Sequence, residues 1–81
     1  MTAQTTAKIS LIGQIAEIDR EIGERQKLYP RLVNEGKMKE EHRKMLMDRI
    51  LSVRATLLWV QSHEADFRAW MAEQKREVAQ R

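Results

Sequence analysis

Cysteine is absent from this chain, proline occurs once, glycine three times, and the aromatic residues are two Trp, one Tyr and one Phe. Without cysteine the chain can form no disulfide, and two histidines alone make a structural zinc site improbable on chemical grounds. Few glycines and prolines, with 33% charged residues, disfavour a β-sandwich or barrel and are typical of a helical protein.

Long apolar runs are also missing. The longest is Leu57-Leu58-Trp59-Val60, far short of the roughly 20 residues of a membrane span. The first ten residues lack the apolar block of a secretory signal. The net charge is only +3, with the excess in residues 37–81. We therefore expect no membrane association. A charge excess this small is weak evidence for nucleic-acid binding.

The second half of the chain carries a long apolar seam. Apolar residues recur there at alternating spacings of four and three, an average of 3.5 that is the period of a coiled coil. The seam comprises Leu46, Ile50, Val53, Leu57, Val60, Phe67, Met71 and Val78, interrupted by Glu64 and Gln74. No glycine or proline falls in this stretch, so we predict one continuous helix over about 39–79.

A second seam with the same rhythm precedes it. Its members are Leu11, Ile15, Ile18, Ile22, Arg25, Tyr29 and Leu32. It predicts a helix over about 7–33, after a flexible N-terminus at 1–6. Pro30 either ends this helix at Leu28 or kinks it before one more turn, and the continuing seam favours the kink. Gly36 or Asn34 would supply the left-handed residue that ends the helix, in a turn over 34–38.

A short turn between two amphipathic helices makes them antiparallel neighbours. A reversal near residue 35 places residue i opposite about residue 71 − i, so that Ile22 lies near Ile50 and Arg25 faces Leu46. Both seams then meet. We predict an all-α fold, a single coiled-coil-like helical hairpin domain over 7–81 with a long second helix.

The second helix extends beyond the first, and its apolar residues there have no partner within the chain. Large apolar side chains left in water each forgo about 1.5–3 kcal/mol. We therefore predict a homodimer or higher oligomer, with a four-helix arrangement over 45–71. The residues predicted for this interface are Met47, Leu51, Leu58, Phe67, Trp70 and Met71.

No pattern of catalysis is present. The chain has no glycine-rich phosphate loop and no Ser–His–Asp grouping, and His63-Glu64 lacks the second histidine of a zinc protease, since position 67 is Phe. We predict a non-enzymatic protein without catalytic, cofactor-binding or metal-binding residues, and without a cofactor.

Binding residues can still be nominated. Arg25, Tyr29 and Trp59 are candidate contacts to a protein partner, because Trp, Tyr and Arg dominate binding hot spots. Arg25 either snorkels to the edge of its seam or specifies pairing between chains. Trp59 lies eleven residues before Trp70, on nearly the same helical face, and the two belong either to an oligomer core or to a partner site.

Basic residues near the turn offer an alternative. Arg43, Lys44, Arg49 and Arg54 could contact phosphates of a nucleic acid or nucleotide. Interleaved acidic residues dilute their field, so an ordinary solvated helix face is the competing interpretation.

One segment resembles a known group of proteins. Glu24-Arg25, Tyr29-Pro30-Arg31-Leu32-Val33 and Gly36-Lys37-Met38, followed by an amphipathic helix, are similar to small helical proteins encoded by bacteriophages and prophages. The resemblance covers about residues 24–60 and transfers no site residue. It implies a phage-related binding role in the bacterial cytoplasm. We therefore expect an oligomer that binds a host or phage protein, with nucleic-acid or nucleotide binding and a purely structural coiled-coil role as alternatives.

Overall fold

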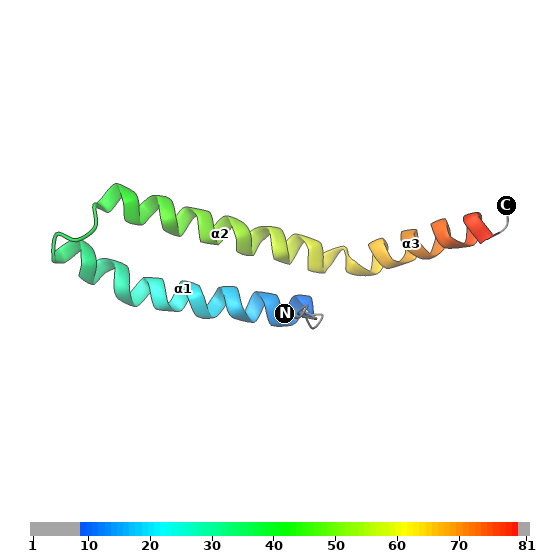
Figure 1. Cartoon of the computed structure of the whole chain (residues 1–81), viewed down its shortest axis with the longest axis horizontal. Helices are drawn as coiled ribbons and strands as arrows, with labels where there is room; N and C mark the ends of the chain where they lie inside the picture. The colour runs from blue at the N-terminus through cyan, green and yellow to red at the C-terminus, as the bar shows by residue number, and fades with distance from the viewer. Residues whose placement is uncertain (1–8, 80–81) are drawn as a thin grey trace, which may run out of the picture.

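The computed structural model describes residues 9–79 and contains α1 (Leu11–Asn34), α2 (Glu40–Ser62) and α3 (Glu64–Ala79). α1 and α2 form an antiparallel hairpin, and α3 extends away from its open end (Figure 1). The radius of gyration is 19.2 Å, well above the about 12 Å of a globular chain this long. The predicted all-α hairpin is confirmed, whereas the flexible segment 1–6 lies outside the described residues.

α1 begins at Leu11 rather than near residue 7. Ser10 is its N-cap, and the Ser10 hydroxyl accepts a hydrogen bond from the Gly13 amide at 3.1 Å. Such a bond satisfies one of the amide groups that a helix start leaves without a partner. The apolar Ile9 precedes this N-cap and continues the helical pattern toward the N-terminus, so the pattern alone predicted an earlier start for the helix.

α1 runs through Pro30 and ends at Asn34, so the interpretation that the helix resumes after Pro30 is confirmed. Gly36 then adopts the left-handed conformation, with φ 73°. Its amide donates to the Val33 carbonyl at 3.1 Å, and the Lys37 amide donates to the Leu32 carbonyl at 2.8 Å. These two bonds form a Schellman motif that closes the helix. The turn occupies residues 35–39, one residue later than predicted.

Replacing glycine by alanine is expected to have opposite effects on stability in the interior of α1 and in its C-terminal cap. Gly36→Ala should lower the free energy of unfolding by about 1 kcal/mol, because a Cβ is strained at positive φ. Gly23→Ala should raise it by about 0.5–1 kcal/mol, because the added methyl meets nothing within 4 Å in a helix interior. Thermal unfolding followed by circular dichroism measures both, and effects of the same sign would contradict this account of the turn.

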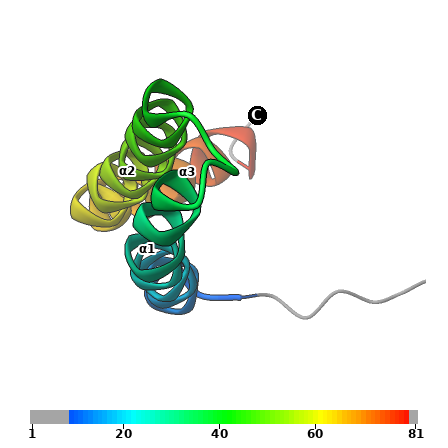
Figure 2. The ribbon, with the colours of Figure 1, turned by 90° about the vertical axis from the view of Figure 1, so that its left-hand side faces the viewer.

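The predicted register of the hairpin is confirmed by a direct contact. Arg25 Nη1 donates to the Leu46 carbonyl at 3.0 Å, and these residue numbers sum to the expected 71. A second bridge joins Arg54 Nε to Asp19 at 2.6 Å. Figure 2, viewed from the turn, shows α2 stacked along α1. Ile22 and Ile50 are the buried residues of this interface, 8% and 9% exposed.

One seam position of α2 departs from its prediction. Val53 is 45% exposed, while the neighbouring Arg54 is half-buried and bridges to α1. Val53 nevertheless lies beside α1, because it lines a shallow groove together with Leu57 and with Ile18 of α1.

The long second helix is interrupted, which corrects the prediction of one continuous helix over 39–79. α2 ends at Ser62, and α3 starts at Glu64. The His63 amide donates to the Val60 carbonyl at 3.1 Å instead of continuing the helical ladder to Trp59. The Trp59 carbonyl accepts from the Ser62 hydroxyl at 2.8 Å and lies 2.8 Å from His63 Nδ1. Side chains that compete for backbone partners in this way bend or break helices.

Candidate interaction surface

α3 carries an apolar stripe along one side, and none of its residues is buried. Phe67 is 44% exposed, and Trp70, Met71 and Val78 are each more than 60% exposed. A shallow groove here is lined by Trp70, Met71, Gln74, Lys75, Val78 and Ala79. Within the described residues α3 makes contact with α2 and none with α1. The overhang expected from the sequence is therefore present, and the hairpin does not cover it.

An aromatic cluster joins the end of α2 to the start of α3. The rings of Trp59 and His63 lie 4.3 Å apart between centroids, and Phe67 packs edge-on to Trp59 at 6.1 Å. Trp59 remains 56% exposed, so its ring is positioned by these neighbours and still accessible. A preordered, exposed indole is a favourable anchor for a partner. The Ser-His pair at the helix junction was the sequence signal that could have revealed this cluster.

The remaining residues predicted for an oligomer interface lie on α2. Leu51 is 46% exposed and Leu58 36% exposed, seven residues apart on one side of the helix. Met47 is half-buried beside the hairpin interface. Two of these three residues are thus available to another chain, on a different side of α2 from Trp59 by helical spacing.

Arg25 and Tyr29 are tied into the hairpin. Arg25 bonds to Glu21 at 2.9 Å as well as to the Leu46 carbonyl, and its side chain is 21% exposed. Its guanidinium lies 5.7 Å from the centroid of the Tyr29 ring, a cation–π distance. Of the three candidate partner-binding residues, Trp59 is therefore the one whose side chain is both exposed and unoccupied by the hairpin.

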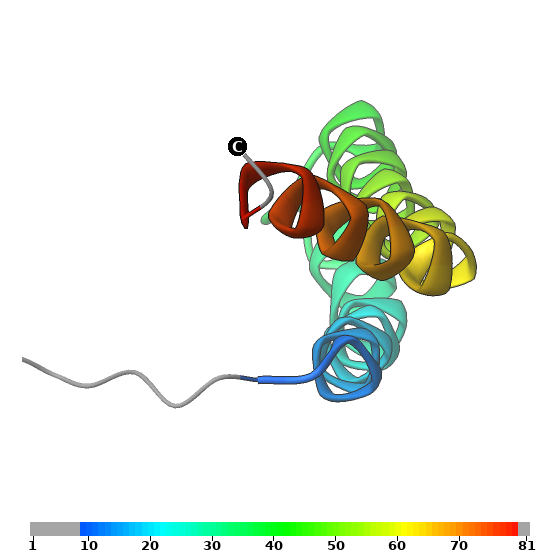
Figure 3. The same ribbon diagram turned by 90° about the vertical axis from the view of Figure 1, so that its right-hand side faces the viewer.

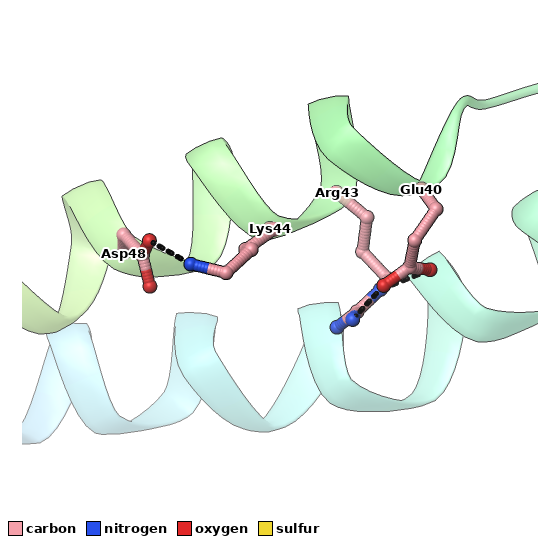
Figure 4. Close-up of polar contacts among 4 residues, drawn as sticks. All are labelled: Glu40, Arg43, Lys44 and Asp48. Carbon is pink, nitrogen blue, oxygen red and sulfur yellow. Dashed lines mark hydrogen bonds and ion pairs between the residues drawn. The ribbon is translucent and has the colours of Figure 1, made fainter.

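The four candidate phosphate-binding residues do not form a single patch. Arg43 and Arg54 lie eleven residues apart on one side of α2, whereas Lys44 and Arg49 lie on two other sides by helical spacing. Ion pairs join Arg43 to Glu40 and Lys44 to Asp48 (Figure 4), and Arg54 to Asp19.

These ion pairs also affect titration. The hydrogen bonds from Arg43 lower the pKa of Glu40 and keep its carboxylate charged beside the guanidinium. A phosphate would have to compete with carboxylates already in place on three of the four basic residues. Phosphate binding by this set stays a prediction, and the geometry does not favour it.

Other classes of site can be examined over the same residues. Within 9–79, no three side chains of His, Asp or Glu lie close enough together to hold a metal ion. None of the three described helices is both long and apolar enough to cross a membrane.

Comparisons of the chain with protein families, with curated proteins and with solved structures find no match in any of the three.

Proposed function

We propose that this chain is a non-enzymatic, self-associating helical protein of phage or prophage origin that acts in the bacterial cytoplasm by binding another protein. The observation that carries the proposal is the uncovered stripe of α3, with Trp70 63% and Met71 61% exposed. The setting is supported by the resemblance, read from the sequence alone, of about residues 24–60 to phage-encoded helical proteins.

The energetics of α3 favour a partner. At 16 residues, α3 is near the length at which an isolated helix is marginal in water, and the ring of Phe67 in its first turn packs on Trp59 of α2. Burial of its apolar side chains would gain up to about 1.5–3 kcal/mol for each one fully covered. A partner surface that packs on this stripe would therefore both stabilise α3 and remove its apolar side chains from water.

Two surfaces have separate roles in this proposal. The stripe of α3, with Leu51 and Leu58 of α2, mediates self-association, while Trp59 contacts the protein target. Modulation of a host factor is the biological action that we propose for this binding. Nucleic-acid or nucleotide binding through α2 is the less favoured alternative, because ion pairs already engage three of its four basic residues.

Sedimentation velocity at tens of micromolar tests the self-association. We expect a dimer or larger species for the natural chain and a shift to monomer for Met71→Asp, because a charge in the stripe must be desolvated to pair. Ala69→Asp, on the opposite side of α3, is the matched control and should leave the oligomer intact. A natural chain that sediments as a monomer would overturn the proposal.

A further inference from the structure

The junction between α2 and α3 leaves helical hydrogen bonds unmade. In a continuous helix each amide donates to the carbonyl four residues earlier. Here the His63 amide donates to the Val60 carbonyl, and the ladder resumes with the Phe67 amide, which donates to the His63 carbonyl at 3.0 Å. Over the described residues, no backbone carbonyl accepts from the amides between them, those of Glu64, Ala65 and Asp66. Figure 3 shows the result, since α3 leaves the end of α2 in a different direction.

Two side chains bind the carbonyl that this break makes available. The Ser62 hydroxyl donates to the Trp59 carbonyl at 2.8 Å, and His63 Nδ1 lies 2.8 Å from the same oxygen and 3.0 Å from Ser62 Oγ. A carbonyl oxygen only accepts, and the hydroxyl already gives it its one hydrogen. His63 Nδ1 therefore carries a hydrogen, which it shares between the two oxygens. The neutral ring is thus the Nδ1–H tautomer, because the hydrogen bond to one ring nitrogen decides which nitrogen is protonated.

The same imidazole ring positions an exposed indole. Its centroid lies 4.3 Å from that of Trp59, with an angle of 30° between the ring planes. The Phe67 ring lies 6.3 Å from the His63 ring. One side chain, His63, therefore contacts both the carbonyl where the helix breaks and the ring of Trp59.

We propose that Ser62 and His63 form a conformational clamp. While they bind the Trp59 carbonyl, α2 and α3 stay separate, and when they release it the two join into one continuous helix. The amides of residues 64–66 gain helical partners on release, so the two forms exchange hydrogen bonds of similar strength and lie close in free energy. No glycine or proline occurs in residues 37–81 to prevent a continuous helix.

The clamp couples two surfaces of the molecule. Its release changes the direction of the α3 stripe relative to the hairpin, and it also removes the imidazole ring that packs on Trp59. The hairpin does not have to open, because α3 makes no contact with α1 among the described residues. The inference goes beyond the proposed function and requires neither self-association nor a partner.

Amide hydrogen exchange of the full chain tests the clamp. Ser62→Ala/His63→Phe removes both donors, while Phe keeps an aromatic ring beside Trp59 and has about the helix propensity of His. The amides of residues 64–66 should then exchange at least about tenfold more slowly, because they gain helical partners. Ser52→Ala/His42→Phe, the same changes at exposed positions of α2, should leave their exchange unchanged. Equal rates in the natural chain and the Ser62/His63 variant would overturn the inference.

A conservative variant separates the hydrogen bond from the shape of the ring. In His63→Asn the side-chain amide nitrogen is as many bonds from the backbone as Nδ1, and Asn has about the helix propensity of His. It should keep the rapid exchange of residues 64–66, whereas His63→Phe alone should slow it. The opposite ranking would show that ring packing, and not the donor, causes the break.

Nitrogen-15 shifts of the two histidine rings test the tautomer, at a pH where both rings are neutral. We expect the Nδ1–H form to dominate in His63 and a mixture of tautomers in His42, which is exposed and has no hydrogen bond to its ring among the described residues. A dominant Nε2–H form in His63 would overturn the inference.

These measurements are independent of the proposed function. A natural chain that sediments as a monomer but responds to the Ser62 and His63 variants as expected retains the clamp and rejects self-association. A dimer whose amides at 64–66 exchange alike in all variants retains self-association and rejects the clamp.

Discussion

Ile50→Ala is expected to lower the free energy of unfolding by about 2–3 kcal/mol, at the lower end of the range for truncation of a buried isoleucine. Ile50 is 9% exposed and Ile22 8% exposed, and these two side chains are the most buried among the described residues. A hairpin with so few buried side chains has no other core to absorb the loss. Urea unfolding followed by circular dichroism, at one fixed protein concentration, measures the effect.

Ile12→Ala is the matched control for this experiment. The same side chain is removed from the same kind of helix, but Ile12 is 72% exposed and its truncation should change stability by less than about 0.5 kcal/mol. Comparable losses for Ile12 and Ile50 would mean that the hairpin interface is not where the chain gains its stability.

Pro30→Ala is expected to raise the free energy of unfolding by about 2 kcal/mol. Pro30 is exposed and lies within α1, four residues before its end. Proline has no N–H to donate to the Gln26 carbonyl and its ring crowds the preceding turn, so alanine is about 3 kcal/mol better in a helix interior. We expect a smaller difference here, because Pro30 lies near the end of α1 and because proline lowers the conformational entropy of the unfolded chain.

The control for Pro30→Ala is Lys27→Ala, an exposed substitution in the same part of α1 that should be nearly neutral. Thermal unfolding of the two variants with the natural chain makes the comparison. A lower melting temperature for Pro30→Ala would show that the proline is needed to place the last turn before Gly36.

Much of the candidate surface could be predicted because its causes are local. The spacing of Phe67, Met71 and Val78 identified an apolar stripe, and the end of the first seam indicated that nothing in the chain would cover it. The pairing of Arg25 with Leu46 followed from the position of the turn. The aromatic cluster of Trp59, His63 and Phe67 was missed, although the Ser-His pair at the helix junction was a signal for it, because its geometry depends on how the chain turns at residue 63.

The amino-acid sequence by itself determined the two helices of the hairpin, its reversal at Gly36 and its register. These follow from periodicity and from the freedom of glycine at positive φ. Tertiary structure alone decided that Arg54 pairs with Asp19 of α1 while Val53 stays 45% exposed, because a contact between side chains 35 residues apart depends on how the two helices pack. The structure also decided the break at His63. The Ser62 hydroxyl and the His63 ring compete with the backbone for the Trp59 carbonyl, and the sequence alone does not show which donor reaches that carbonyl.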